Sequence, residues 1–235
     1  MNKKLLLRKA HRYIALIVSL QLLAWTIGGI WFTWNDIDDI HGDNLRNFDK
    51  TKIAQAQIST QTALDNIPDF EQLESINVIR FLKQPAYRIK YNTNKLVLVN
   101  AITGSIIPDI NKLQAIDIAK ENTNFEANIA TIKLVTETSK HHEYRGKPLP
   151  AWAITYDYPE SPTFYVSTKL GTLTSVRHNS WRIFDFLWML HTMDYEGRDD
   201  FGNWIIKIFS LIALVTALSG IILFFISRRK KQRSN

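Results

Sequence analysis

The 235-residue sequence contains no cysteine. This absence excludes disulfide bonds, thiolate catalysis, and zinc or iron–sulfur sites with cysteine ligands. It does not indicate a redox compartment, because a chain without cysteine suits either side of a membrane. The sequence also lacks the G-x-S-x-G, H-E-x-x-H, Walker A and dinucleotide-binding motifs. We therefore expect no soluble catalytic constellation, and we assign no catalytic residue and no metal ligand.

Acidic residues are absent from both ends of the chain. All 22 of them lie between Asp36 and Asp200, whereas five Lys or Arg residues lie within residues 1–12 and five more within residues 228–233. The net charge of +7 therefore belongs to the tails, and acidic residues outnumber basic ones over residues 34–203. A nucleic-acid-binding surface needs basic residues clustered on a folded domain. We therefore exclude nucleic acid as a partner.

Two long apolar stretches flank the centre of the chain. Residues 13–34 carry no charge, and residues 204–226 carry only Lys207. About 20 residues at about 1.5 Å each cross a hydrocarbon core of about 30 Å, so each stretch is long enough to span a membrane. The first stretch is longer than the core of a signal peptide, and no small-residue cleavage site follows it. We predict two transmembrane helices in contact with the lipid bilayer.

The basic tails set the expected orientation of these spans. Residues 1–12 and 227–235 both obey the positive-inside rule only when both termini are cytoplasmic. We therefore expect a two-pass protein of the bacterial inner membrane, with residues ~35–203 in the periplasm. The other boundaries that we expect are transmembrane helices at 13–34 and 204–226, repeated units at 35–108 and 109–179, and an amphipathic, interfacial segment at 180–203.

Small residues occur in both spans. Gly28 and Gly29 lie in the first, and Ala213, Ala217 and Gly220 follow one another in the second at spacings of four and three. Small residues let two helices approach closely. Two interpretations stay open, namely packing between the two spans of one chain and formation of a homodimer.

The region between the spans is an internal repeat. Residues 95–107 match residues 162–174. The glycines that these segments share, Gly104 and Gly171, are expected at chain reversals because glycine adopts a positive φ without strain. The upstream matches are residues 85–91 with 150–156 and residues 59–65 with 111–117.

Each repeat is expected to hold one helix and a small antiparallel sheet. Ser59 and Asn111 are expected to cap the two helices. Apolar residues alternate along 87–91 and 152–156, so that one face of each strand packs on a core. The predicted fold class is an α+β extracytoplasmic domain, with a helix and a three-stranded sheet in each repeat, between two transmembrane α-helices.

Three segments carry a resemblance to a known family. Residues 9–15 read KAHRYIA, residues 99–107 read VNAITGSII, and residues 181–204 read WRIFDFLWMLHTMDYEGRDDFGNW. They resemble the PepSY-associated transmembrane family, whose first span opens with K-x-H-R-x-x-G and whose later segment reads W-x-x-x-D-x-L-W-x-L-H-T-M-D-Y. Ala15 stands where the family usually has glycine. The resemblance covers nearly the whole chain and implies a short, two-span member whose repeats are PepSY-like units.

The resemblance implies three functions. The first is an inner-membrane-anchored protein that presents a periplasmic binding or accessory module to a membrane or periplasmic protein partner. The second is a haem-binding transmembrane electron carrier that supports ferric-siderophore reduction in iron uptake, because larger members resemble siderophore ferrireductases. The third is a regulator of an extracytoplasmic peptidase, because PepSY modules occur in inhibitory propeptides. We favour the first because the sequence shows no catalytic constellation.

Histidines near the membrane are the candidate ligands for haem b, which the resemblance implies. Neutral imidazole is a good iron ligand, and His11 and His191 are expected at opposite membrane faces, about 30 Å apart. One chain therefore cannot hold one haem with both, but a homodimer would pair each histidine with its counterpart. His41 is a weaker partner for His191, and Asp194 is expected to orient His191 through a hydrogen bond.

A second interpretation of His191 needs no cofactor. Phe184, Trp188, His191 and Tyr195 follow helical spacing and share one face of the segment 181–195. Such a helix lies in the membrane interface with its tryptophan and tyrosine side chains at headgroup depth. The sequence leaves open whether this helix continues into the second span or breaks near Gly197.

Overall fold

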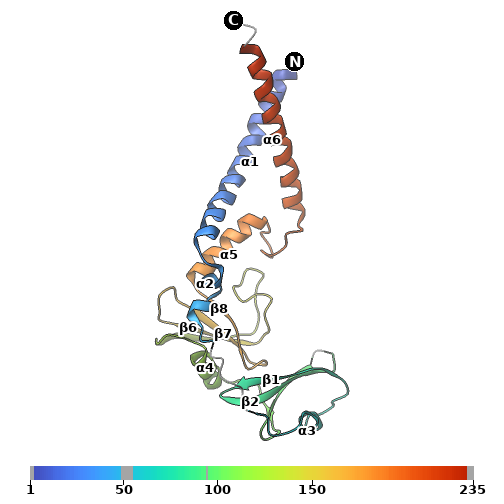
Figure 1. The fold of residues 1–235 in the computed structure, drawn as a ribbon, viewed down its shortest axis with the longest axis vertical. Coiled ribbons are helices and arrows are strands. Elements are labelled where there is room, and N and C mark those ends of the chain that lie inside the picture. Colours follow the sequence, from blue (N-terminus) through green and yellow to red (C-terminus); the bar gives the residue numbers. More distant parts are fainter. Residues whose placement is uncertain (1–2, 49–54, 94, 232–235) are drawn as a thin grey trace. The chain divides into compact units, whose positions relative to one another are not determined.

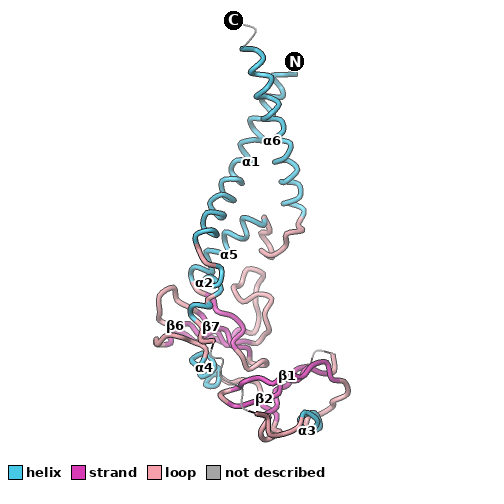
Figure 2. Tube along the Cα trace, in the orientation of Figure 1, coloured by secondary structure: helices cyan, strands magenta, loops and turns pink. Residues whose placement is uncertain are grey.

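The computed structural model describes residues 3–48, 55–93 and 95–231, and the outermost parts of the two basic tails lie outside these ranges. The chain forms two compact units, which Figures 1 and 2 show as ribbon and tube. The membrane unit consists of residues 1–36 and 183–235, and the sheet unit consists of residues 37–182.

The membrane unit contains the two long helices that the sequence predicts. Helix α1 runs from Lys3 to Trp34, and α6 runs from Trp204 to Lys231. Within them, Arg8–Trp34 and Trp204–Ile226 are long and apolar enough to cross a membrane. Helix α1 begins well before the uncharged stretch, because lysine and arginine are good helix formers. The change of composition at residue 13 is therefore not a helix boundary.

The two long helices pack on each other through a small buried cluster. Val18 of α1, Phe209 of α6 and Met193 from the segment before α6 form its centre, and Ala213 packs beside them. Farther along, Gly220 lies against the ring of His11. Part of the small-residue series of α6 thus packs against α1 of the same chain, which is one of the two interpretations above. Homodimer formation stays a prediction.

The sheet unit holds two repeats, each with one helix followed by four antiparallel strands. The first sheet has the strand order β1-β2-β3-β4 and the second has the order β5-β6-β7-β8. The elements in chain order are α2 (Ile37–His41), the 3₁₀ turn η1 (Asp43–Leu45), α3 (Thr60–Asp65), β1 (Leu73–Phe81), β2 (Gln84–Tyr91), β3 (Lys95–Asn100), β4 (Ile106–Ile107), α4 (Lys112–Glu121), β5 (Ile129–Val135), β6 (Ala151–Tyr156), β7 (Thr163–Ser167) and β8 (Leu173–Arg177).

The expected count of three strands in each sheet is wrong by one. After Gly104, the chain pairs back along β3 through Ile106 and Ile107, and after Gly171 it pairs back along β7 through β8. Both glycines have a positive φ, +79° and +61°. The turn glycine that ends the third strand therefore also starts a fourth.

Side chains cap both repeat helices as the sequence predicts. Oγ of Ser59 accepts a hydrogen bond from the amide of Thr62 at 3.1 Å. Asn111 and Gln114 form a reciprocal capping box at the start of α4. Each cap satisfies an amide that has no partner inside its helix.

One core joins the two repeats. Ile118 of α4 packs with Ile154 and Phe164 of the second sheet, and Phe81 and Leu98 of the first sheet belong to the same buried cluster. At this junction a Cβ atom built on Gly171 would lie 2.7 Å from Cδ1 of Leu98. The repeats therefore meet at a turn in which residue 171 has no room for a side chain of its own.

The loop between β5 and β6 is anchored by buried side chains. Tyr144 is fully buried and stacks on Tyr165 with ring centroids 4.4 Å apart. Beside it, the carboxylate of Glu143 accepts hydrogen bonds from Nε of Arg182 at 2.6 Å and from the hydroxyl of Tyr165 at 2.7 Å. Burial alone would raise the pKa of Glu143, but these two hydrogen bonds, together with the charge of Arg182 and the nearby His142, outweigh burial and lower the pKa from its ordinary value of 4.5.

The lowered pKa of Glu143 predicts a loss of stability in acid. A carboxyl whose pKa is lower in the folded state stabilises the fold above its ordinary value of 4.5, and this contribution is lost as the pH falls through the folded pKa. We expect Glu143→Gln to cost about 1.5–3 kcal/mol at pH 7 and progressively less in acid. Thermal unfolding from pH 7 down to about pH 2.5, which passes below the ordinary pKa, measures this. Glu126→Gln, at an exposed position, is the control, and a cost that stays constant with pH would contradict the assignment.

Candidate functional site

Helix α5 (Asn179–Thr192) ends against α1, and side chains satisfy its last carbonyl groups. Within any helix, the last four carbonyl groups have no partner. Three side chains donate to them here: Gln21 to Leu190 (2.7 Å), Trp25 to His191 (3.0 Å) and Asn203 to Thr192 (2.9 Å). The end of α5 is thereby fixed between α1 and the start of α6.

Aromatic rings surround His191 at this end of α5. Its ring stacks on Trp188 with centroids 6.1 Å apart, and Trp25 and Phe32 of α1 lie at 5.7 and 6.1 Å. Phe184 stacks on Trp188 in turn, so these residues share one face of α5 as expected. Nδ1 of His191 is buried and has no hydrogen-bond partner. An unpaired buried nitrogen is costly, so this is the atom of His191 with which a ligand would pair.

The segment after His191 breaks between α5 and α6. Met193 has a φ of +53°, which ends α5 at Thr192, and α6 begins only at Trp204. Tyr195, which was expected on the aromatic face, lies in the intervening loop. The segment 181–195 is therefore not continuous with the second span.

Asp194 organises this loop. Its carboxylate accepts hydrogen bonds from the amides of Glu196, Gly197, Asp199 and Asp200, at 3.0–3.2 Å. The amide of Asp200 makes the largest contribution to lowering the pKa of Asp194, and burial opposes it. The carboxylate thus binds the backbone of its own loop. Nδ1 of His191 has no hydrogen-bond partner, and the orienting role expected for Asp194 stays a prediction.

A buried ion pair ties the loop to α5. Arg198 donates to the carboxylate of Asp185, and the two side chains are 18% and 6% exposed. The sequence places Arg198 in a charged turn but gives no sign of its partner, which lies 13 residues away on α5. Pairing offsets the cost of removing both charges from water.

His11 lies where α1 meets α6. The hydroxyl of Ser219 donates to the carbonyl of Thr216 at 2.8 Å, so its oxygen accepts from Nδ1 of His11 at 2.7 Å. A Cβ atom built on Gly220 would lie 3.3 Å from Cε1 of the same ring. The ring is therefore held in one orientation by a hydroxyl and a glycine of α6.

A family model described as the PepSY-associated TM region matches residues 8–235. The chain belongs to the PepSY-associated TM family. This confirms the resemblance stated from the sequence. No curated protein and no solved structure shows a significant match, so neither comparison transfers an activity to this member of the family.

His11 and His191 of this PepSY-associated TM protein do not meet within one chain. His191 contacts Trp25, which lies 14 residues after His11 on α1, so the two histidines are roughly 20 Å apart along the helix. His41 is an exposed residue of α2 and belongs to the sheet unit. Among the described residues, no group of three or more His, Asp or Glu side chains is placed to hold a metal ion.

The sheet unit contains a buried histidine that the sequence analysis missed. His178 is 3% exposed, and its Nδ1 lies 2.6 Å from a carboxylate oxygen of Glu160. Its Nε2 lies 3.0 and 3.1 Å from the carbonyl oxygens of Asp39 and Ile40. Each ring nitrogen faces an acceptor oxygen, and a ring nitrogen donates to it only when that nitrogen carries a hydrogen atom. His178 thus joins α2 to the segment that leads into α5.

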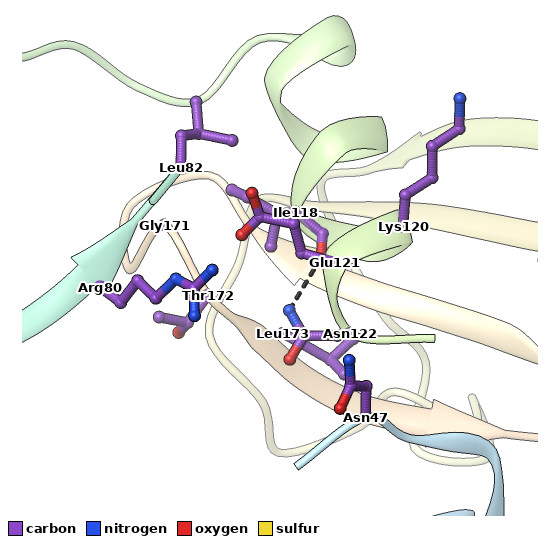
Figure 3. Close-up of a pocket in the computed structure, with 10 residues that line it drawn as sticks. All are labelled: Asn47, Arg80, Leu82, Ile118, Lys120, Glu121, Asn122, Gly171, Thr172 and Leu173. Atoms are coloured by element: carbon purple, nitrogen blue, oxygen red, sulfur yellow. Dashed lines mark hydrogen bonds between the residues drawn. The ribbon is translucent and has the colours of Figure 1, made fainter. Parts of the chain in front are cut away.

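A polar cavity of about 420 Å³ lies where the two repeats of the PepSY-associated TM protein meet. Its walls come from β1, from the end of α4 and from the turn between β7 and β8. Figure 3 shows the side chains of Arg80 and Glu121 beside Thr172, with Asn47 and Asn122 at the other wall. The repeat explains this cavity, because it forms at the seam between the two modules.

Proposed function

We propose that this PepSY-associated TM protein is an inner-membrane-anchored accessory protein, both of whose termini are cytoplasmic and whose PepSY-like repeats bind a protein partner in the periplasm. The cavity between the repeats carries the proposal. It is open and polar, and residues of both charge signs line it. Such a recess suits a polar segment of a protein better than an apolar small molecule, whose pocket is lined mainly by hydrophobic side chains.

Charge reversal at the cavity tests the binding role. Glu121 lines the cavity, whereas Glu126 is exposed outside it. We expect one protein to be recovered by cross-linking from native membranes with the wild-type chain and with Glu126→Lys, but several-fold less with Glu121→Lys. Equal recovery with both variants, or no recovered partner, would contradict the proposal.

Reporter fusions test the orientation separately. The basic tails favour cytoplasmic termini, so a reporter that is active only in the cytoplasm should be active after Asn235 and inactive in the sheet unit. An exported C-terminus would overturn the periplasmic assignment. The third function named above, peptidase regulation, stays a prediction of the family resemblance.

One observation favours the haem-binding alternative, namely the buried and unpaired Nδ1 of His191 among aromatic rings. His11 and His191 of one chain are too far apart to hold one haem between them. Two copies of the chain would supply each pair, and a haem held by His191 and its counterpart would carry one electron at a time.

An optical spectrum tests the haem alternative. If it is right, the detergent-purified protein should show a Soret band that His191→Ala removes. His141→Ala is the control, because His141 is exposed in the loop between β5 and β6, and it should keep the band. A wild-type protein that shows no Soret band after growth with added haem would eliminate this alternative.

A further inference from the structure

Helices α1 and α6 are staggered in the membrane unit. Three contacts define their register: His11 with Ser219 and Gly220, Val18 with Phe209, and Trp25 with Phe209. Because antiparallel helices both rise about 1.5 Å per residue, Trp204 lies level with about residue 26 of α1. Residues 27–34 therefore extend beyond α6 and pack on α5 instead, where Phe32 lies 5.2 Å from Phe184. Figure 1 shows α5 between the separated ends of α1 and α6.

The stagger means that one hydrocarbon core of about 30 Å cannot cover both apolar stretches, 13–34 and 204–226, over their full lengths. A core that follows residues 13–34 of α1 would include α6 to about residue 217 and would extend past the start of α6 into the loop before it. It would place Lys207 near its middle. It would also place the exposed carboxylates of Asp199 and Asp200 among acyl chains, and their short side chains cannot reach the surface.

A hydrocarbon core that follows α6 would place fewer charged side chains among the acyl chains. It would cross α1 between about residues 6 and 26. Lys207 would then lie within about one turn of a membrane surface. Arg8, Lys9 and Arg12 would lie in the half nearer the termini, where long basic side chains extend to the headgroups. All three are exposed, and the guanidinium of Arg12 lies 5.2 Å from the centre of the Tyr13 ring.

We propose that the hydrocarbon core crosses α1 between about residues 6 and 26, and that residues 27–34 together with residues 183–186 of α5 form a surface for the lipid headgroup layer. The exposed side chains of this surface are apolar or aromatic. Trp34 is 83% exposed, Ile30 45%, Ile183 48% and Phe186 51%. Tryptophan and other amphipathic or aromatic side chains favour this layer. The surface is also continuous with the exposed apolar faces of α1 and α6, which contact the acyl chains.

Spin labels measure these depths directly. The chain has no cysteine, so single-cysteine variants carry one label each. The full-length protein is purified and placed in phosphatidylethanolamine–phosphatidylglycerol vesicles, with oxygen as the apolar relaxant and a nickel chelate as the polar one. Ala10→Cys and Ile30→Cys are both at exposed positions of α1. We expect a several-fold higher ratio of oxygen to nickel accessibility at residue 10 than at residue 30, and the reverse order would overturn the proposal.

A label at Phe186→Cys identifies what covers α5, with exposed Lys133→Cys as the water reference. We expect nickel accessibility between the values at residues 10 and 133. Protection from both relaxants would mean that a second copy of the chain covers α5, and accessibility equal to that of residue 133 would mean that water does. Either result would contradict the proposal. The measurement needs neither a partner nor a known orientation, so its failure is separate from failure of the proposed function.

Discussion

Replacing Arg198 with methionine should lower the free energy of unfolding by about 3–5 kcal/mol, which is the usual cost of removing one partner from a buried ion pair. The Asp185 side chain is 6% exposed and would lose this counter-ion. Methionine retains much of the arginine stem, so the loss of packing is small. Denaturation of the detergent-solubilised full-length protein, followed by tryptophan fluorescence, measures the effect.

A double variant separates the ion pair from packing. Asp185→Leu combined with Arg198→Met removes both charges, and replacing a buried ion pair with apolar side chains is often neutral or stabilising. We therefore expect the double variant to be clearly more stable than Arg198→Met alone. If the two variants are equally unstable, the cost comes from the shape of the loop and not from the carboxylate that has lost its arginine.

Gly171→Ala should strongly destabilise the sheet unit. The residue has a φ of +61°, and its Cβ would lie 2.7 Å from Leu98 and 3.1 Å from Phe81. The left-handed backbone costs about 1–2 kcal/mol for alanine, and overpacking a core costs about 1–3 kcal/mol more. We expect a total loss of about 2–5 kcal/mol, which the same denaturation experiment measures.

Gly146→Ala is the matched control for this substitution. Gly146 also has a positive φ, +68°, but a Cβ atom added there would have no heavy atom of another segment within 4 Å. We expect it to cost only the backbone part, about 1–2 kcal/mol. Equal losses at the two positions would show that the close approach of Gly171 to Leu98 and Phe81 adds no cost beyond that of the backbone.

The elements of the fold followed from local patterns. The two spans were evident from long apolar runs. The helix starts at Ser59 and Asn111 were evident from the capping residues themselves. The matched glycines, Gly104 and Gly171, located two of the turns. A fourth strand in each repeat was missed, because β4 is only two residues long and because β8 follows its turn without a clear boundary.

The candidate site was predicted less completely. Helical spacing placed Phe184, Trp188 and His191 on one face, and the structure shows these rings stacked. The role expected for Asp194 stays a prediction, and the structure adds that backbone amides two to six residues later donate to its carboxylate. His178 was missed, since its partner Glu160 and the carbonyl oxygens of α2 come from distant segments.

The sequence by itself determined that the chain has two apolar helices, a duplicated α+β centre and the motifs of its family. These properties depend on solvation and on neighbours a few residues apart, which a single sequence records directly. The tertiary structure alone decided which charges pair, where the repeats touch and how far α1 extends beyond α6. These depend on side chains brought together from distant positions, and no local pattern encodes such distances.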